Sequence, residues 1–112
     1  METSKKVFIS QPMSDKTDDE IFAARESAIC ALNNQLRSGV EILDSFFRNV
    51  PHEAKPVWFL GESIKVLSNA DMALFLGDWR KYRGCRTEHL ICKEYDIPTY
   101  EMNEVGDIVP VA

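Results

Sequence analysis

A dense group of cations stands close to one carboxylate in the last third of the chain. The segment from Arg80 to Arg86 holds four cationic side chains in seven positions, although the whole chain has a net charge of -5. Gly84 would let a ligand approach the backbone closely, and a helix that begins near Arg86 would add free amides and the positive end of its dipole. This combination favours an anionic ligand such as a phosphate. The alternative is a solvated basic loop that offsets acidic surface elsewhere.

Glu88 follows this segment and is expected in the first turn of a helix from Arg86 to Tyr95. In that place the helix dipole and the Arg86 guanidinium would keep the carboxyl ionised. An ionised carboxylate can act as a nucleophile at an anomeric carbon, because negative charge stabilises an oxocarbenium-like transition state. A first-turn glutamate can equally do no more than match the helix dipole, so spacing alone leaves both roles open.

Alternating strands and helices are expected to position these residues. The hydropathy pattern predicts strands at Lys6–Ser10, Val40–Leu43, Met72–Leu76 and Thr99–Met102, and helices that begin near Thr17, Val57 and Arg86. No element is assigned to the tail after Met102. This order predicts an α/β fold: a three-layer, doubly wound parallel sheet of four to five strands, Rossmann-like or flavodoxin-like. We expect residues 1–112 to form one domain, because the chain is about as long as one typical domain.

The first helix has the clearest local signals. Thr17 and Glu20 have the spacing of a capping box, and Gly39 offers a left-handed stop. One apolar stripe is predicted for the buried face of this helix, consisting of Ile21, Ala24, Ala28, Leu32 and Leu36.

The carboxyl ends of the strands predict where a ligand would bind, because doubly wound sheets bind ligands at that edge. Asp44 could accept a hydrogen bond from a ribose hydroxyl. Trp79 could stack on a base, or it and Trp58 could be core or interface aromatics. The binding residues predicted at this edge are Ser10, Gln11, Pro12, Met13, Asp44, Asp78, Trp79, Arg83, Gly84 and Arg86.

A resemblance adds to these signals. Four segments stand in an order and at spacings that resemble the nucleoside 2-deoxyribosyltransferase-like family: Phe8-Ile-Ser-Gln-Pro-Met13, Asn69-Ala-Asp71, Gly84-Cys-Arg-Thr-Glu88 and Ile97-Pro98. The likeness is greatest to a small phage and bacterial branch, and the family includes deoxynucleoside monophosphate N-glycosidases. It implies a Rossmann-like fold and cleavage or transfer at an N-glycosidic bond of a nucleoside or nucleotide, with Glu88 as the catalytic nucleophile.

The chain also departs from the pattern of that family. Phe8 stands where its enzymes usually carry Tyr, Ser63 where they carry Asp, and Tyr82 where they carry Asp or Ser. Arg86 replaces the second glycine of a Gly-x-Gly-x-Glu pattern. A noncatalytic nucleotide-binding protein, a sensor or sequestering factor with the same pocket, is therefore the alternative, and a small interaction domain is a third interpretation.

The composition limits the kinds of partner that the protein is expected to bind. A sequence pI near 5.0 argues against a general nucleic-acid binder. No apolar run approaches the ~20 residues of a membrane span, and the first residues lack the apolar segment of a signal peptide, so we expect no membrane partner and a cytoplasmic location. Three cysteines without a Cys-x-x-Cys pair fit a reducing compartment.

Because the chain is short and carries Phe46, Phe47 and Trp58 in or near a long middle loop, we expect a homodimer or higher homo-oligomer.

Other chemistries have weaker patterns. Cys85, His89 and Cys92 have spacings that suit zinc ligands on one helical face, but no fourth ligand is evident, so no metal is expected. A Ser or Cys nucleophile with His and Asp has candidates but no nucleophile-elbow pattern. The chain lacks the glycine-rich motifs of NAD and ATP enzymes, and no cofactor is expected.

Overall fold

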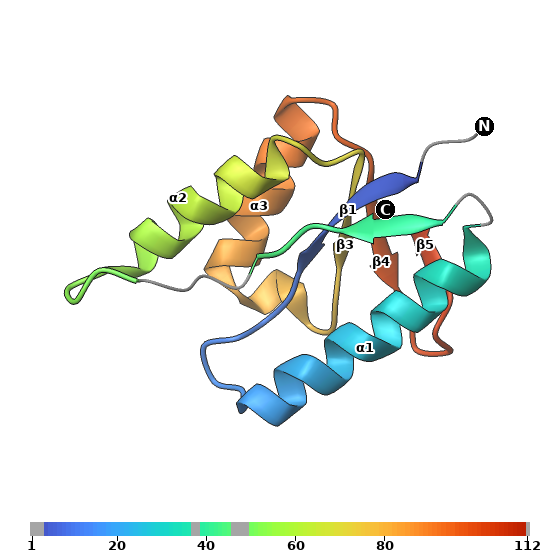
Figure 1. The fold of residues 1–112 in the computed structure, drawn as a ribbon, viewed down its shortest axis with the longest axis horizontal. Coiled ribbons are helices and arrows are strands. Elements are labelled where there is room, and N and C mark those ends of the chain that lie inside the picture. The colour runs from blue at the N-terminus through green and yellow to red at the C-terminus, as the bar shows by residue number, and fades with distance from the viewer. Residues whose placement is uncertain (1–3, 37–38, 46–49, 112) are drawn as a thin grey trace.

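A five-stranded sheet runs through the middle of the molecule (Figure 1). The computed structural model describes residues 4–36, 39–45 and 50–111. The strands are β1 (Lys5–Ser10), β2 (Val40–Ile42), β3 (Met72–Phe75), β4 (Thr99–Met102) and β5 (Ile108–Pro110). Their order in the sheet is β2-β1-β3-β4-β5, and the first four run parallel. The predicted α/β sheet is confirmed, with an antiparallel β5 in the tail to which the sequence assigned no element.

Helices cover both faces of this sheet. Helix α1 (Asp18–Gln35) lies on one face, and α2 (Pro56–Leu67) and α3 (Arg83–Glu94) lie together on the other (Figure 1). A short 3-10 turn, η1 (Trp79–Lys81), connects β3 to α3. The three layers predicted from the alternating pattern are therefore present. No helix in the described ranges is both long and apolar enough to cross a membrane.

Strand β1 supplies both halves of the core, because successive side chains of a strand point to opposite faces. Val7 and Ile9 pack with Leu32 of α1, whereas Phe8 packs in a second cluster with Cys85 and Cys92 of α3. The same alternation turns Ser10 toward the face that α3 covers. One polar side chain at the end of β1 is thereby directed at the helix that carries Glu88.

The start of α1 is as predicted, but its buried stripe differs by one residue. The Thr17 hydroxyl accepts the Glu20 N–H at 3.1 Å, and the Glu20 carboxylate accepts the Thr17 N–H at 2.9 Å, which completes the capping box. The apolar stripe in the sequence predicts Ala24 on the buried face; Ala24 is exposed, and Arg25 is buried instead. Spacings of four, three and four residues from Ile21 follow the helical period, and Arg25 fits because its guanidinium finds acceptors.

Helix α3 begins three residues earlier than expected, at Arg83 rather than Arg86. Tyr82 is its N-cap, and the Arg86 N–H donates to the Tyr82 carbonyl at 3.0 Å. Gly84 accordingly lies inside the first turn and not in a loop. Glu88 lies in the second turn, so the expectation of a first-turn carboxylate beside the free amides is wrong.

A side chain of α1 holds the last strand in place. The Gln35 amide nitrogen donates to the Ile108 carbonyl at 3.3 Å, and its amide oxygen accepts the Ile108 N–H at 2.8 Å. β5 pairs with β4 on its inner side, with Val109 opposite Glu101 and Pro110 opposite Tyr100. Gln35 binds the N–H and the carbonyl of Ile108 on the outer side of β5, where a further strand would otherwise bind.

Candidate functional site

A buried hydrogen bond joins the end of β1 to the middle of α3. The Ser10 hydroxyl donates to Glu88 Oε1 at 2.6 Å, and the two residues are 2% and 7% exposed. Glu88 shares its buried helix face with Cys85 and Cys92, two apolar neighbours. A carboxyl group in such surroundings needs hydrogen-bond donors, and Ser10 supplies one.

Burial decides the protonation of this carboxyl. Loss of water raises the pKa of Glu88 above its ordinary value of 4.5, and hydrogen bonds from Ser10 and Ser63 lower it by less. The Arg86 guanidinium, expected from the sequence to favour the ionised form, is not among the causes of this shift, and Glu88 lies a turn further into the helix, against the sheet.

The pair lies where the chain connections diverge. β1 and β3 are neighbours that end level with each other, with Ser10 opposite Phe75. The helix after β1 packs on one face, and the helix after β3 packs on the other. Such a topological switch point is the place where doubly wound sheets bind ligands. Ser10 and Glu88 were both predicted site residues, and the structure brings them together there.

A buried arginine ties the ends of β1 and β2 to α1. Arg25 is 7% exposed and donates to Gln11 Oε1 at 3.3 Å, to the Leu43 carbonyl at 3.2 Å and to Ser45 Oγ at 3.5 Å. Burial lowers the pKa of Arg25, while the charge of Asp44 raises it. Gln11 also donates from its amide nitrogen to the Ile21 carbonyl at 3.1 Å. The polar groups at these two strand ends are therefore held in fixed positions.

Two loops meet across the ends of β1 and β3. The Tyr82 hydroxyl donates to Asp15 Oδ1 at 2.6 Å, and this bond raises the pKa of Tyr82 to about 12. Gly77, with a φ of +58°, lies next to the Pro12 ring, since a side-chain carbon added there would stand 4.0 Å from Pro12 Cγ. The segment after β1 is therefore in contact with the segment that leads into α3. We call the Tyr82–Asp15 hydrogen bond the loop latch.

Two arginines of the predicted cation cluster form hydrogen bonds with other groups of the protein. Arg80 donates to both carboxylate oxygens of Glu101 at 3.0 and 3.4 Å, and its guanidinium lies over the Trp79 ring at 4.4 Å. Arg86 donates to the Arg80 carbonyl at 3.0 Å. Arg83 and Arg86 remain exposed on the first turn of α3. These two are the arginines of the cluster that an anion would reach most readily.

Trp79 is a core residue in the structure. It is 3% exposed, its ring packs against Phe75 and His89 at centroid distances of 4.7 and 4.8 Å, and its Nε1 donates to Glu101 at 3.2 Å. Burial in this cluster also lowers the pKa of His89. Base stacking on Trp79 is therefore unfavourable, because aromatic neighbours and Arg80 already pack against its ring.

The other predicted binding residues lie around this edge without joining the buried pair. Pro12 is buried, while Met13, Asp44 and Asp78 are exposed after their strands. Gly84 is half-buried in α3, and a side-chain carbon there would meet no atom within 4 Å, so the fold does not require glycine. Phe46 and Phe47, predicted interface residues, lie outside the described residues.

Sequence reasoning missed part of the polar network. The sequence marks Ser63 only as a departure from a family pattern, yet Ser63 lies on α2 and forms a hydrogen bond with the Glu88 carboxyl. The sequence predicts no role for Arg25 and places Ser45 only within the strand end Asp44–Phe47 at the ligand-binding edge. A charged residue one position from an apolar stripe is the signal that could have revealed Arg25, because Ile21, Arg25, Ala28 and Leu32 fit the helical period as well as a stripe through Ala24 does.

Zinc ligation by the proposed trio does not fit its surroundings. Cys85 and Cys92 belong to the apolar cluster, and burial raises the pKa of each thiol to about 11. Across the part of the chain that the structure describes, no three His, Cys, Asp or Glu side chains gather as a metal site. Comparisons with protein-family models, with curated proteins and with solved structures find no match to this chain.

Proposed function

We propose that this protein binds a nucleoside or nucleotide at the carboxyl edge of its sheet and breaks the N-glycosidic bond with Glu88 as nucleophile. The observation that supports the proposal most is the buried Ser10–Glu88 hydrogen bond at the switch point between β1 and β3. The proposal also draws on the resemblance of four segments to the nucleoside 2-deoxyribosyltransferase-like family.

The chemistry requires an ionised, oriented carboxylate. Glu88 would attack the anomeric carbon and form a glycosyl ester, while the bond from that carbon to the base nitrogen breaks and the base leaves with the electron pair and takes up a proton. Water would then add to the same carbon, release a proton and restore the carboxylate; a second base in place of water would give transfer. The hydrogen bond from Ser10 favours the ionised form and fixes one carboxylate oxygen.

Two exposed cations near the proposed site suggest that the protein prefers phosphorylated substrates. Arg83 and Arg86 project from the first turn of α3, and Glu88 lies one turn further along the same helix. A 5'-phosphate near that turn would meet both guanidinium groups and the amide end of the helix. Arg83→Ala and Arg86→Ala should each weaken the binding of a nucleoside monophosphate by about tenfold or more. They should weaken the binding of the matching nucleoside much less.

A noncatalytic nucleotide-binding protein is the second candidate, and the raised pKa of Glu88 favours it. A carboxyl group whose pKa is raised by burial is neutral over a wider pH range, and a neutral carboxyl is no nucleophile. In this case the Ser10–Glu88 pair would support the ligand-binding edge without reacting.

The deciding experiment is a release assay. The protein is incubated with a panel of nucleosides, deoxynucleosides and their monophosphates, and free base is measured by chromatography. We expect release from at least one deoxynucleotide by the wild type and its loss in Glu88→Gln, while binding of the same nucleotide stays within about threefold. Glu94→Gln, an exposed acid near the end of the same helix, is the matched control and should keep wild-type activity.

Two results would decide against catalysis by Glu88. Equal release by wild type and Glu88→Gln would remove Glu88 as the nucleophile. No release from any member of the panel, together with arginine-dependent binding, would establish the noncatalytic candidate. If the wild type is active, Ser10→Ala should shift the acid limb of the pH–activity profile to higher pH than in the wild type. The variant loses a hydrogen bond that lowers the pKa of Glu88.

We also propose that the protein works as a homodimer or higher homo-oligomer in the cytoplasm. Val57 and Phe59 of α2 are 68% and 41% exposed, and Val50 is also exposed just before this helix. A second copy would cover these apolar side chains. Cys30, Cys85 and Cys92 are free thiols, which suits a reducing compartment.

A further inference from the structure

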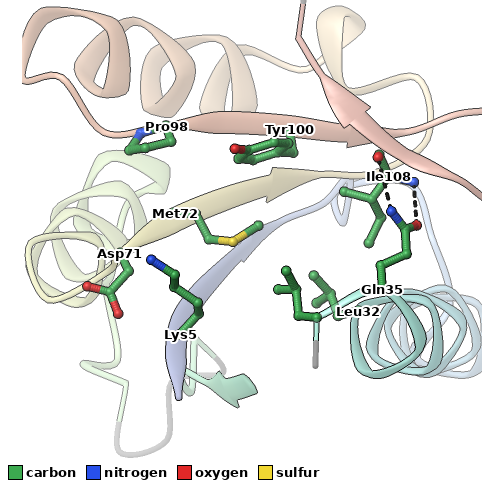
Figure 2. A pocket seen from close by; sticks show the side chains of 9 residues that line it. Lys5, Leu32, Gln35, Asp71, Met72, Pro98, Tyr100 and Ile108 are labelled. Carbon is green, nitrogen blue, oxygen red and sulfur yellow. Dashed lines mark hydrogen bonds between the residues drawn. The ribbon is translucent and has the colours of Figure 1, made fainter. Parts of the chain in front are cut away.

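A cavity of about 220 Å³ lies far from the Ser10–Glu88 pair, near the amino ends of the parallel strands (Figure 2). It is bordered by the last turn of α1 and by the strands of the sheet. Its walls are formed by Lys5, Leu32, Gln35, Leu36, Asp71, Met72, Pro98, Tyr100 and Ile108. At about 20 to 30 Å³ per non-hydrogen atom, the space suits a ligand of about seven to eleven such atoms.

One end of the cavity is apolar. Leu32 and Met72 are buried core residues, and Ile108 packs against them, so their side chains are fixed by the fold. The Gln35 amide beside them is bonded in both directions to the backbone of Ile108 (Figure 2). Since that amide is satisfied, this end offers a ligand apolar contact and few polar groups.

The other end carries two charged groups. Figure 2 shows the Lys5 ammonium and the Asp71 carboxylate at the end of the cavity away from Leu32 and Ile108, and the Tyr100 hydroxyl across Met72 from Lys5. One oxygen of Asp71 accepts the Lys6 N–H at 2.8 Å, which holds the carboxylate in place. Within the described residues, the Lys5 ammonium forms no ion pair and the Tyr100 hydroxyl no hydrogen bond. A cation and an anion thus lie at one end of the cavity, and a hydroxyl donor lies between them and the apolar end.

We propose that this cavity binds a free α-amino acid with an aliphatic side chain. The ligand carboxylate would bind Lys5, and its ammonium group would bind the second oxygen of Asp71. Its side chain would lie on Leu32, Met72 and Ile108. A zwitterion matches both charges at once, whereas a simple carboxylate would be repelled by Asp71 and a simple amine by Lys5.

This site is independent of the proposed nucleotide site. Lys5 and Asp71 stand at or just before the first residues of their strands, whereas Ser10 ends β1 on the opposite edge of the sheet. A nucleotide that binds near Glu88 should therefore not compete with the amino acid. Failure of either proposal leaves the other unaffected.

The test is a titration of the isotope-labelled protein followed by NMR. Leucine is compared with isocaproate, which lacks the ammonium group, and with isoamylamine, which lacks the carboxylate. We expect saturable shifts at the amides of Met72, Tyr100 and Ile108 with leucine, and affinities about tenfold weaker for the two analogues. Glutamate serves as a zwitterion whose charged side chain does not suit the apolar end.

Two variants remove the charges and keep the fold. Lys5→Gln and Asp71→Asn should each weaken leucine by about tenfold, and Asp71→Asn keeps an oxygen that can accept the Lys6 N–H. Lys93→Gln, on the exposed side of α3, is the matched control and should bind leucine as the wild type does. Absence of saturable shifts, equal affinity for leucine and either analogue, or full binding by both variants would overturn the proposal.

Discussion

At the scale of single residues, Glu88 is a buried carboxyl group in mainly apolar surroundings. It lies on the buried face of α3 between two thiols and is supported by hydroxyl groups from Ser10 and Ser63. Proteins seldom bury a carboxyl group without a cation beside it, because water stabilises the ionised form so strongly. Glu88 therefore carries a cost to folding that a neutral residue of the same shape would avoid.

The first prediction concerns this cost. Because burial raises the pKa of Glu88, the folded protein holds the proton more tightly than the unfolded chain does, and the stability that this group contributes is lost as pH rises from 4.5 through the higher pKa of the folded protein. Glu88→Gln should accordingly be more stable than the wild type near neutral pH. The difference should disappear well below 4.5, where the wild-type carboxyl is protonated in both states.

Urea unfolding of both proteins across this pH range measures the effect. Glu94→Gln should show no such pH-dependent gain, because its side chain is exposed. Lower stability of Glu88→Gln at neutral pH would contradict the raised pKa.

At the scale of elements, hydrogen bonds between side chains connect the ends of the strands. Arg25 joins α1 to the residues after β1 and β2, and the loop latch joins the segment after β1 to the start of α3. The latch lies close in sequence to Cys85, whose thiol is buried beside Ser10. These links make the edge near Glu88 dependent on residues that come from four parts of the chain.

The second prediction concerns Arg25. Arg25→Met keeps the apolar stem of the side chain but leaves the acceptors of Gln11, Leu43 and Ser45 without this donor. Loss of a charged donor from a buried cluster should lower the free energy of unfolding by about 3 kcal/mol. Urea denaturation measures this loss of stability.

The control is Arg83→Met, which removes an exposed arginine and should change stability by no more than about 0.5 kcal/mol. Equal effects of the two variants would show that burial of Arg25 contributes nothing.

The third prediction concerns the loop latch. In a Cys30→Ser background, Tyr82→Phe and Asp15→Asn should let an aromatic disulfide reagent label Cys85 several-fold faster, up to about tenfold, because a hydrogen bond that holds the two loops together is lost. Labelling is followed by mass spectrometry, with Cys92 of the same helix as the internal control. The interpretation fails if Cys85 and Cys92 accelerate together, since that would indicate opening of the whole molecule.

At the scale of the whole molecule, the amino-terminal half of α2 extends away from the sheet (Figure 1). Only Leu67, at the other end of this helix, is fully buried. The exposed side chains at the free end are mainly apolar, and the Trp58 and Phe59 rings touch edge to face at 5.1 Å. Against the described residues alone, Val57 and Phe59 at this end of α2 remain exposed.

The fourth prediction is that this end mediates self-association. Sedimentation at micromolar concentration should show a dimer or larger assembly for the wild type and a monomer for a Val57→Lys, Phe59→Lys double variant, because two buried charges would be unpaired. Added salt should change assembly less than nucleotide affinity, because the surface is apolar. Val105→Lys, an exposed apolar residue in the turn between β4 and β5, is the control. A monomeric wild type would contradict the prediction.

Strong local patterns made much of the architecture predictable. The apolar run at Met72, the capping box at Thr17 and the strand at Thr99–Met102 all appear where the sequence places them. β5 could not be predicted, since three residues carry too little periodicity and the strand depends on Gln35 across 73 positions of sequence. The contact of Ser10 with Glu88 needs the register of two elements 78 residues apart, which no local pattern contains.

The contact of Gln35 with β5 also affects how the protein avoids aggregation. An edge strand with free N–H groups can recruit a strand from another molecule and start a growing stack. The outward N–H of Ile108 is occupied by the Gln35 side chain, and Pro110 has no N–H to offer. At the opposite edge, β2 is only three residues long. Polymerisation by strand addition is therefore disfavoured at both edges, and Gln35→Ala should increase fibril formation on prolonged incubation, because it frees the Ile108 N–H.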